Sequence, residues 1–149
     1  RDRQKTIALA KWLIKNGIKS GDRVAVLGTN SPESIIAMLA TASVGAIFTS
    51  CSPDFGEEGI IDRFGQCQPK IFITTDGYIY AGKKYCIKDK VANIAKRITS
   101  IKKTINIRYI GNLENEYKYD WHSIVSDMDI DDFEFKKFPF NIPLLYPLF

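Results

Sequence analysis

Short apolar segments alternate with segments of helical periodicity over the first 110 residues, and this alternation limits the possible folds more than any other feature of the chain. We expect strands at residues 23–28, 46–50, 70–75 and 105–111, and helices at residues 6–15, 32–43, 57–68 and 87–103. Strands that alternate with helices are typical of parallel βαβ units. The sequence therefore predicts an α/β fold with a partial doubly wound parallel sheet and flanking helices.

Local signals support several of these boundaries. Asn16-Gly17 suits a left-handed end to the first helix, and Pro32 suits the first turn of the second. Asn30 or Ser31 could cap that second helix. Residues 76–85 contain glycine and read as a loop between the third strand and the fourth helix.

Residues 112–149 differ in character from the α/β portion at residues 1–111. They begin acidic and aromatic, with at most one short helix around residues 121–127, and end in FPFNIPLLYPLF, which contains three prolines. Proline is excluded from helix interiors and central strands. We interpret residues 112–149 as an irregular connector.

Composition argues against three classes of function. The net charge is only +4 and the lysines are scattered, whereas nucleic-acid binding favours a basic run with interleaved aromatic residues. Three cysteines without a CxxC pair, together with a single histidine, do not suit a zinc site. Apolar runs are far shorter than the roughly 20 residues of a membrane span. We expect reduced thiols and a cytoplasmic location.

Ligands of α/β sheets bind at the carboxyl ends of the strands. In this chain the segments at those ends read GTNSPE, SCSPDFG, TDGYIYAGKK and GNLEN. They contain neither GxGxxG nor GxxxxGK[ST], so the dinucleotide fingerprint and the phosphate loop of the P-loop type are both missing from them.

Individual residues in these segments suit modest roles. Asp54 could act as a general base, but capping the following helix, with the carboxylate near its start at Glu57, is the more ordinary role. Cys51 would need a histidine to act as a nucleophile, and His122 lies far along the chain. Lys83 and Lys84 directly follow a glycine and could contact a phosphate or simply be solvated.

The stretch AMLATASVGAIFTSCSPDFG, followed by DRFGQCQPKIF and YAGK, resembles the amino-terminal subdomain of the adenylate-forming acyl-CoA synthetases. Within this family it is most similar to the branch that activates acetoacetate. The resemblance covers residues 2–110, is faint over residues 111–135 and returns at FPFNIPLLYPLF. In the family, the corresponding segment leads into a phosphate loop rich in serine, threonine and glycine.

The resemblance implies a two-step ligase reaction in the complete enzyme. Acetoacetate attacks the α-phosphate of ATP with the help of Mg²⁺, giving an acyl-adenylate and diphosphate. The thiol of coenzyme A (CoA) then displaces AMP and forms acetoacetyl-CoA. The family's phosphate loop, adenine-binding segment and mobile-domain lysine would all follow residue 149, so no catalytic residue and no metal ligand is assigned here.

The resemblance also implies CoA contacts within this segment. In related acetyl-CoA synthetases, the loop that aligns with Ser52, Pro53 and Asp54 lies beside the CoA nucleotide, and a basic residue aligned with Lys83 contacts a CoA phosphate. The present sequence departs from that pattern, because the relatives have glycines in place of Pro53 and Asp54 and an arginine in place of Tyr80.

We therefore expect an amino-terminal fragment of an acetoacetate–CoA ligase that is inactive in isolation. Two alternatives remain open. The chain could be a non-catalytic remnant that binds only CoA or a protein partner through uncovered sheet edges. It could also be an unrelated α/β nucleotide-binding module, although the missing glycine motifs argue against this alternative.

Overall fold

The computed structural model describes residues 2–111 and 116–127. The chain order of the elements is α1 (Asp2–Lys15), β1 (Arg23–Leu27), α2 (Pro32–Ser43), β2 (Ile47–Cys51), α3 (Glu57–Cys67), β3 (Ile71–Thr75), β4 (Gly77–Tyr80), β5 (Lys83–Cys86), α4 (Lys88–Arg97), β6 (Lys103–Ile107) and α5 (Trp121–Val125). No described helix has the length and apolar character that crossing a membrane requires.

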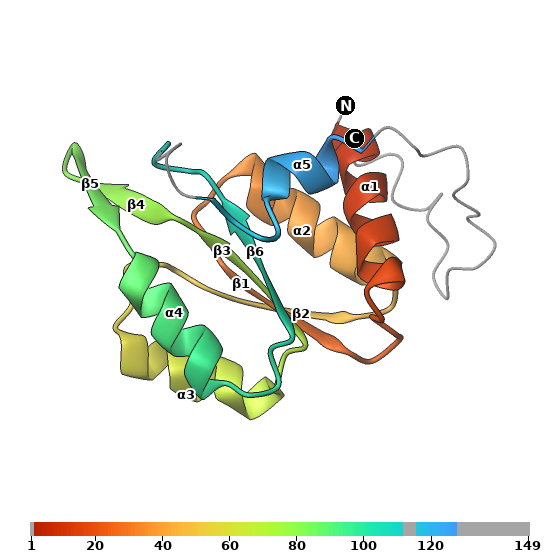
Figure 1. The fold of residues 1–149 in the computed structure, drawn as a ribbon, viewed down its shortest axis with the longest axis horizontal. Helices are drawn as coiled ribbons and strands as arrows, with labels where there is room; N and C mark the ends of the chain where they lie inside the picture. The colour runs from red at the N-terminus through yellow and green to blue at the C-terminus, as the bar shows by residue number, and fades with distance from the viewer. Residues whose placement is uncertain (1, 112–115, 128–149) are drawn as a thin grey trace.

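Four strands form a parallel sheet in the order β2-β1-β3-β6. Helices α1, α2 and α5 cover one face of this sheet, and α3 and α4 cover the other (Figure 1). The predicted doubly wound α/β arrangement is confirmed. Because the chain turns to β2 on one side of β1 and to β3 on the other, the order of the strands reverses beside β1.

Alternating side chains along the central strand serve two cores. Val24 and Val26 of β1 pack with α1 and α2, whereas Ala25 and Leu27 pack with α3 and α4. Strand β3 behaves in the same way: its Phe72 meets Phe64 of α3 edge to face, with 6.0 Å between ring centroids. A strand buried on both faces needs apolar side chains on both sides, which residues 24–27 of β1 and 71–73 of β3 provide.

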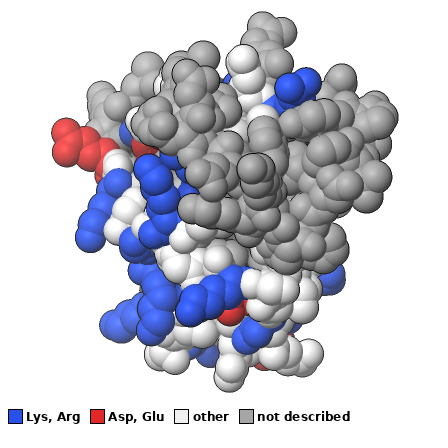
Figure 2. Space-filling view, turned by 90° about the vertical axis from the view of Figure 1, so that its right-hand side faces the viewer, with Lys and Arg blue, Asp and Glu red and all other residues white. Residues whose placement is uncertain are grey.

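Lys and Arg side chains gather on the side of the molecule where the strands begin (Figure 2). Two of them hold backbone carbonyls at helix ends: Arg23 Nε donates to Cys67 O at 2.6 Å, and Lys70 Nζ donates to Gly17 O at 3.5 Å. Helices that return to the start of a parallel sheet end there with unpaired carbonyls, which cations stabilise. Arg23 and Lys70 thus stabilise helix ends within the fold.

The segment predicted as a loop at residues 76–85 is a β-hairpin, so that prediction is wrong. Strands β4 and β5 pair antiparallel around a two-residue turn at Ala81 and Gly82, which have φ values of 49° and 75°. Positive φ at both positions is the mark of a type I′ turn, whose twist matches that of the flanking strands. Tyr78 and Tyr85 stack across the hairpin with 5.1 Å between their ring centroids.

The fourth predicted helix is too long, and the fourth predicted strand both starts and ends too late, since β6 ends at Ile107. Helix α4 ends at Arg97, because Ile98 is buried in an extended conformation and Ser100 Oγ donates to Pro69 O at 2.8 Å. Strand β6 then begins at Lys103. The short helix expected around residues 121–127 is present as α5.

Helix α5 joins the core of the sheet. Its Trp121 and Val125 belong to the apolar core shared by α1, α2 and the sheet, and Asn106 pairs with Asp120 in a parallel bridge. Residues 116–127 therefore pack on the α/β portion, while residues 128–149, including the proline-rich segment, lie outside the described part. The division of the chain between residues 111 and 112 stays a prediction.

Candidate functional site

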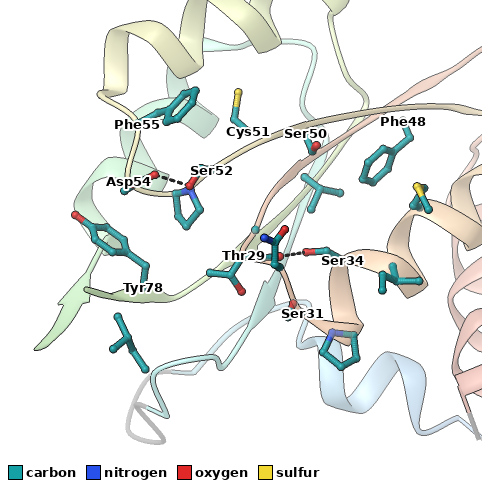
Figure 3. A pocket seen from close by; sticks show the side chains of 18 of the residues that line it. Thr29, Ser31, Ser34, Phe48, Ser50, Cys51, Ser52, Asp54, Phe55 and Tyr78 are labelled. Carbon is teal, nitrogen blue, oxygen red and sulfur yellow. Dashed lines mark hydrogen bonds between the residues drawn. The ribbon is translucent and has the colours of Figure 1, made fainter. Parts of the chain in front are cut away.

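A cavity of about 910 Å³ opens at the carboxyl ends of β1 and β2 (Figure 3). Its walls come from the loop after β1, the first half of α2, the loop after β2 and strand β4. This is the edge of a doubly wound sheet at which ligands bind. The lining is mixed: Phe48 and Met38 supply apolar surface, and several hydroxyl groups lie around them.

Residues 52–55 form a tight turn on the rim of this cavity. The backbone N–H of Phe55 donates to Ser52 O at 3.2 Å, which closes a four-residue turn with Pro53 at its second position. The hydroxyl of Ser52 donates to Oδ1 of Asp54 (Figure 3). The structure thus brings the predicted residues Ser52, Pro53 and Asp54 together in one wall of the cavity.

Asp54 does not cap the helix that follows it. Gly56 is the N-cap residue of α3, and no side-chain hydrogen bond caps that end. The expectation of a capping role is therefore wrong. The physical reason is the turn itself, in which the carboxylate accepts from Ser52 and lies two residues before the N-cap.

Lys83 lies beside the cavity wall and is not among the residues that line it. It opens β5 directly opposite Tyr80, whose side chain does line the cavity. Its side chain is exposed, and Nζ lies 5.8 Å from the centroid of the Tyr85 ring. Lys83 and the 52–55 turn thus belong to the same end of the sheet, on separate elements.

Three hydroxyl residues in the first βα loop and the start of α2 were missed as site residues by the sequence reasoning. Thr29, Ser31 and Ser34 all line the cavity, and the Ser34 hydroxyl donates to Thr29 O at 2.7 Å (Figure 3). Thr29 Oγ1 is buried without a hydrogen-bond partner among the described residues. A Cβ on Gly28 would lie 2.7 Å from Ser34 Oγ, so a side chain at this position would displace that hydroxyl. The signal in the sequence that could have identified these residues is the hydroxyl-rich segment TNSPES, which directly follows a predicted strand.

Arg63 on α3 was missed as well. It is exposed on α3 and lines the cavity. Burial raises the pKa of the neighbouring Cys51 thiol, while the charge of Arg63 acts in the opposite direction. The sequence offered no signal for it, since Arg63 sits in an ordinary helical pattern beside Asp62.

Cys51 and His122 do not form a nucleophile and base. Cys51 packs in the core between the sheet and α3, whereas His122 is exposed on α5, a helix on the other face of the sheet (Figure 1). A buried thiol with a raised pKa is a poor nucleophile. Cys51 is therefore a core residue at the end of β2.

The residues of the described ranges include no group of three or more His, Cys, Asp or Glu side chains that could hold a metal ion. The hydroxyl groups, the Arg63 guanidinium and the aromatic side chains suit an extended organic ligand with anionic groups.

Comparison with known proteins places this site in a family. Residues 3–132 match the family described as AMP-binding enzyme. The chain belongs to the AMP-binding enzyme family.

Within the AMP-binding enzymes, acetoacetyl-CoA synthetases are prominent among the similar proteins. The chain is 52% identical over 104 residues to acetoacetyl-coenzyme A synthetase of Rhizobium meliloti (strain 1021), covering 70% of this chain and 16% of that protein. It is 39% identical over 155 residues to acetoacetyl-CoA synthetase of Xenopus tropicalis, and the alignment covers 95% of this chain and 23% of that protein. The structure of acetoacetyl-CoA synthetase from Streptomyces lividans matches with a TM-score of 0.80 at 36% identity, over 84% of this chain and 19% of that one.

Proposed function

We propose that this chain is part of an acetoacetate–CoA ligase and supplies a portion of its CoA site. The observation that carries the proposal is the 52% identity to an acetoacetyl-CoA synthetase over 104 residues, which include the cavity-lining turn. The complete enzyme would convert ATP, acetoacetate and CoA into acetoacetyl-CoA, AMP and diphosphate. The chain spans between 16% and 23% of the length of the curated acetoacetyl-CoA synthetases it matches.

The cavity supports CoA as the ligand met by this segment. CoA is long, with an adenine nucleotide at one end and an uncharged pantetheine arm at the other, so it needs both polar and apolar walls. The Asp54 carboxylate would repel a phosphate. We therefore propose that Ser52, Pro53 and Asp54 meet uncharged parts of CoA, while Lys83, with Lys84 as its neighbour, meets a phosphate.

ATP and Mg²⁺ belong to the same proposal for the complete enzyme. When bound, Mg²⁺ would neutralise phosphate charge during adenylate formation. The described residues hold no acidic cluster that fits the ion, and we assign none of them to it. A cytoplasmic location is likewise our proposal, based on the reduced thiols expected of the three cysteines.

A second candidate function is a non-catalytic remnant that binds CoA or a protein partner. Exposed apolar side chains in the cavity wall favour it, among them Ile35, Ile79 and Tyr80. Apolar surface of this kind marks interaction sites on many proteins. The two candidates share the CoA site and differ in whether adenylate chemistry occurs in the protein that contains this chain.

Calorimetric titration of the chain with CoA tests the proposal. We expect binding, and we expect Lys83→Ala to weaken it by about tenfold, since a charge-assisted hydrogen bond to phosphate is lost. Lys96→Ala, an exposed lysine on α4, is the matched control and should leave the affinity unchanged. The chain alone should form no AMP from ATP, acetoacetate and CoA. Absence of CoA binding, or turnover by the chain alone, would contradict the proposal.

A further inference from the structure

One face of α4 contacts the cavity-lining turn at residues 52–55 and the start of α3. Lys90, Asn93 and Arg97 are spaced three and four residues apart, so they lie along one face of the helix. The Asn93 amide donates to Glu57 Oε1 at 3.3 Å, and the Arg97 guanidinium donates to both carboxylate oxygens of Glu58 at 2.5 and 3.2 Å. These two contacts fix the start of α3 against α4.

Lys90 makes the contact nearest the cavity. Its Nζ donates to Pro53 O and to Phe55 O, both at 2.8 Å. The two carbonyls flank Asp54 on either side along the chain. A single ammonium group therefore fixes the orientation of the Pro53–Asp54 and Phe55–Gly56 peptide units, which enclose Asp54 and Phe55, and with them the direction in which the Ser52–Asp54 pair is presented.

The environment of Lys90 indicates that this contact is a specific one. Lys90 is partly buried, and burial lowers the pKa of its ammonium group, whereas the nearby Asp54 and Glu57 carboxylates act in the opposite direction. Partial desolvation strengthens hydrogen bonds between an ammonium and carbonyl oxygens. Without Lys90, the carbonyls of Pro53 and Phe55 would lose their charged donor.

We propose that Lys90 is a positioning residue, which holds the 52–55 turn in the shape that receives CoA. The proposal rests on the proposed function for the identity of the ligand. Its geometric part stands on the two hydrogen bonds alone. A lysine of α4, 35 and 37 residues away in sequence from the carbonyls it holds, thus becomes part of the support of the site.

Amide hydrogen exchange and CoA titration on the chain test this role. The Phe55 N–H, which donates to Ser52 O, reports on the turn. We expect Lys90→Met to speed its exchange by about tenfold and to weaken CoA binding by a similar factor, because a charge-assisted contact is lost. Lys90→Arg should restore most of both, since a guanidinium can also donate to two carbonyls. Lys96→Met, which removes the same charge from an exposed site on α4, should change neither.

The outcomes separate positioning from general stability. Faster exchange at Phe55 with unchanged exchange at the β1 amides supports the proposal. Unchanged exchange at Phe55 overturns it, and so does an equal increase at Phe55 and in β1, which would mean that Lys90 acts on the whole fold. If the wild-type chain fails to bind CoA, the proposed function fails, while the exchange comparison still decides whether Lys90 holds the turn.

Discussion

Gly77 begins the hairpin at a point with no room for a side chain. A Cβ on this residue would lie 2.2 Å from the carbonyl oxygen of Tyr85 and 2.8 Å from Cδ1 of Ile110. The first of these atoms belongs to the paired strand, so relief requires the hairpin to shift. We predict that Gly77→Ala lowers the free energy of unfolding by about 2 kcal/mol, as overpacking does in other cores. Urea denaturation followed by circular dichroism measures it.

Gly59 provides the matched control at the same scale. It lies inside α3, and a Cβ there would meet no atom within 4 Å. Because alanine favours helix over glycine, Gly59→Ala should raise the free energy of unfolding by up to about 1 kcal/mol. Equal effects of the two substitutions would show that the close approach at Gly77 carries no energetic weight.

At the scale of elements, the turn between α1 and β1 is fixed to the start of β3 by a carboxylate. Asp22 Oδ2 accepts from the Lys19 backbone N–H at 2.8 Å and from Lys70 Nζ at 2.9 Å. Burial alone would raise the pKa of Asp22, but these two donors outweigh it and hold the pKa below its ordinary value of 3.8. A lowered pKa in the folded state stabilises the protein above the ordinary value, and this stabilisation disappears as the pH falls.

We therefore predict a pH-dependent effect of Asp22→Asn. At pH 7 the variant should lose about 0.5–1 kcal/mol of unfolding free energy, a modest value because the Lys70 side chain is partly solvated. The difference from wild type should vanish as the pH drops below 3.8. Urea unfolding over a pH series measures it, with Asp62→Asn on the exposed face of α3 as control. A difference that persists in acid would mean that the charge of Asp22 is not its cause.

The elements also show what local sequence could and could not reveal. Alternating apolar and helical segments predicted the parallel sheet, because burial on both faces demands apolar runs such as residues 24–27 and 71–73. The hairpin was not predicted because its turn is Ala81-Gly82, which lacks the usual Asn-Gly or Asp-Gly signal. Helix α4 was predicted to be too long because apolar residues continue at helical spacing through Ile101, although Ile98 is already in an extended conformation.

The candidate site was predictable only where it follows a strand directly. The 52–55 turn comes straight after β2, so its place at the ligand edge followed from topology. The role of Arg63 could not be predicted because it depends on which face of α3 meets the cavity. The role of Lys90 could not be predicted because its two partners, Pro53 and Phe55, lie 37 and 35 positions away in the sequence. Such contacts are set by the packing of helices, which local patterns do not encode.

At the scale of the whole molecule, the cavity wall leaves a broad apolar surface open. Ile35, Met38, Phe55, Ile79 and Tyr80 all line the cavity, and all are between 43% and 67% exposed. Exposed apolar surface gathered in one place promotes association. In a solution of the pure chain, the available partner is a second copy.

We predict that the chain self-associates in a concentration-dependent manner and that Ile35→Lys weakens this association. The substitution places a charge in the middle of the apolar surface, where a second copy would have to desolvate it. Stability should change by less than about 0.5 kcal/mol, because Ile35 is 57% exposed. Ile14→Lys on α1 is the matched control, since Ile14 is 41% exposed and lies outside the cavity wall. Sedimentation analysis measures the association, and an equal effect of both variants would mean that added net charge, not the cavity surface, controls it.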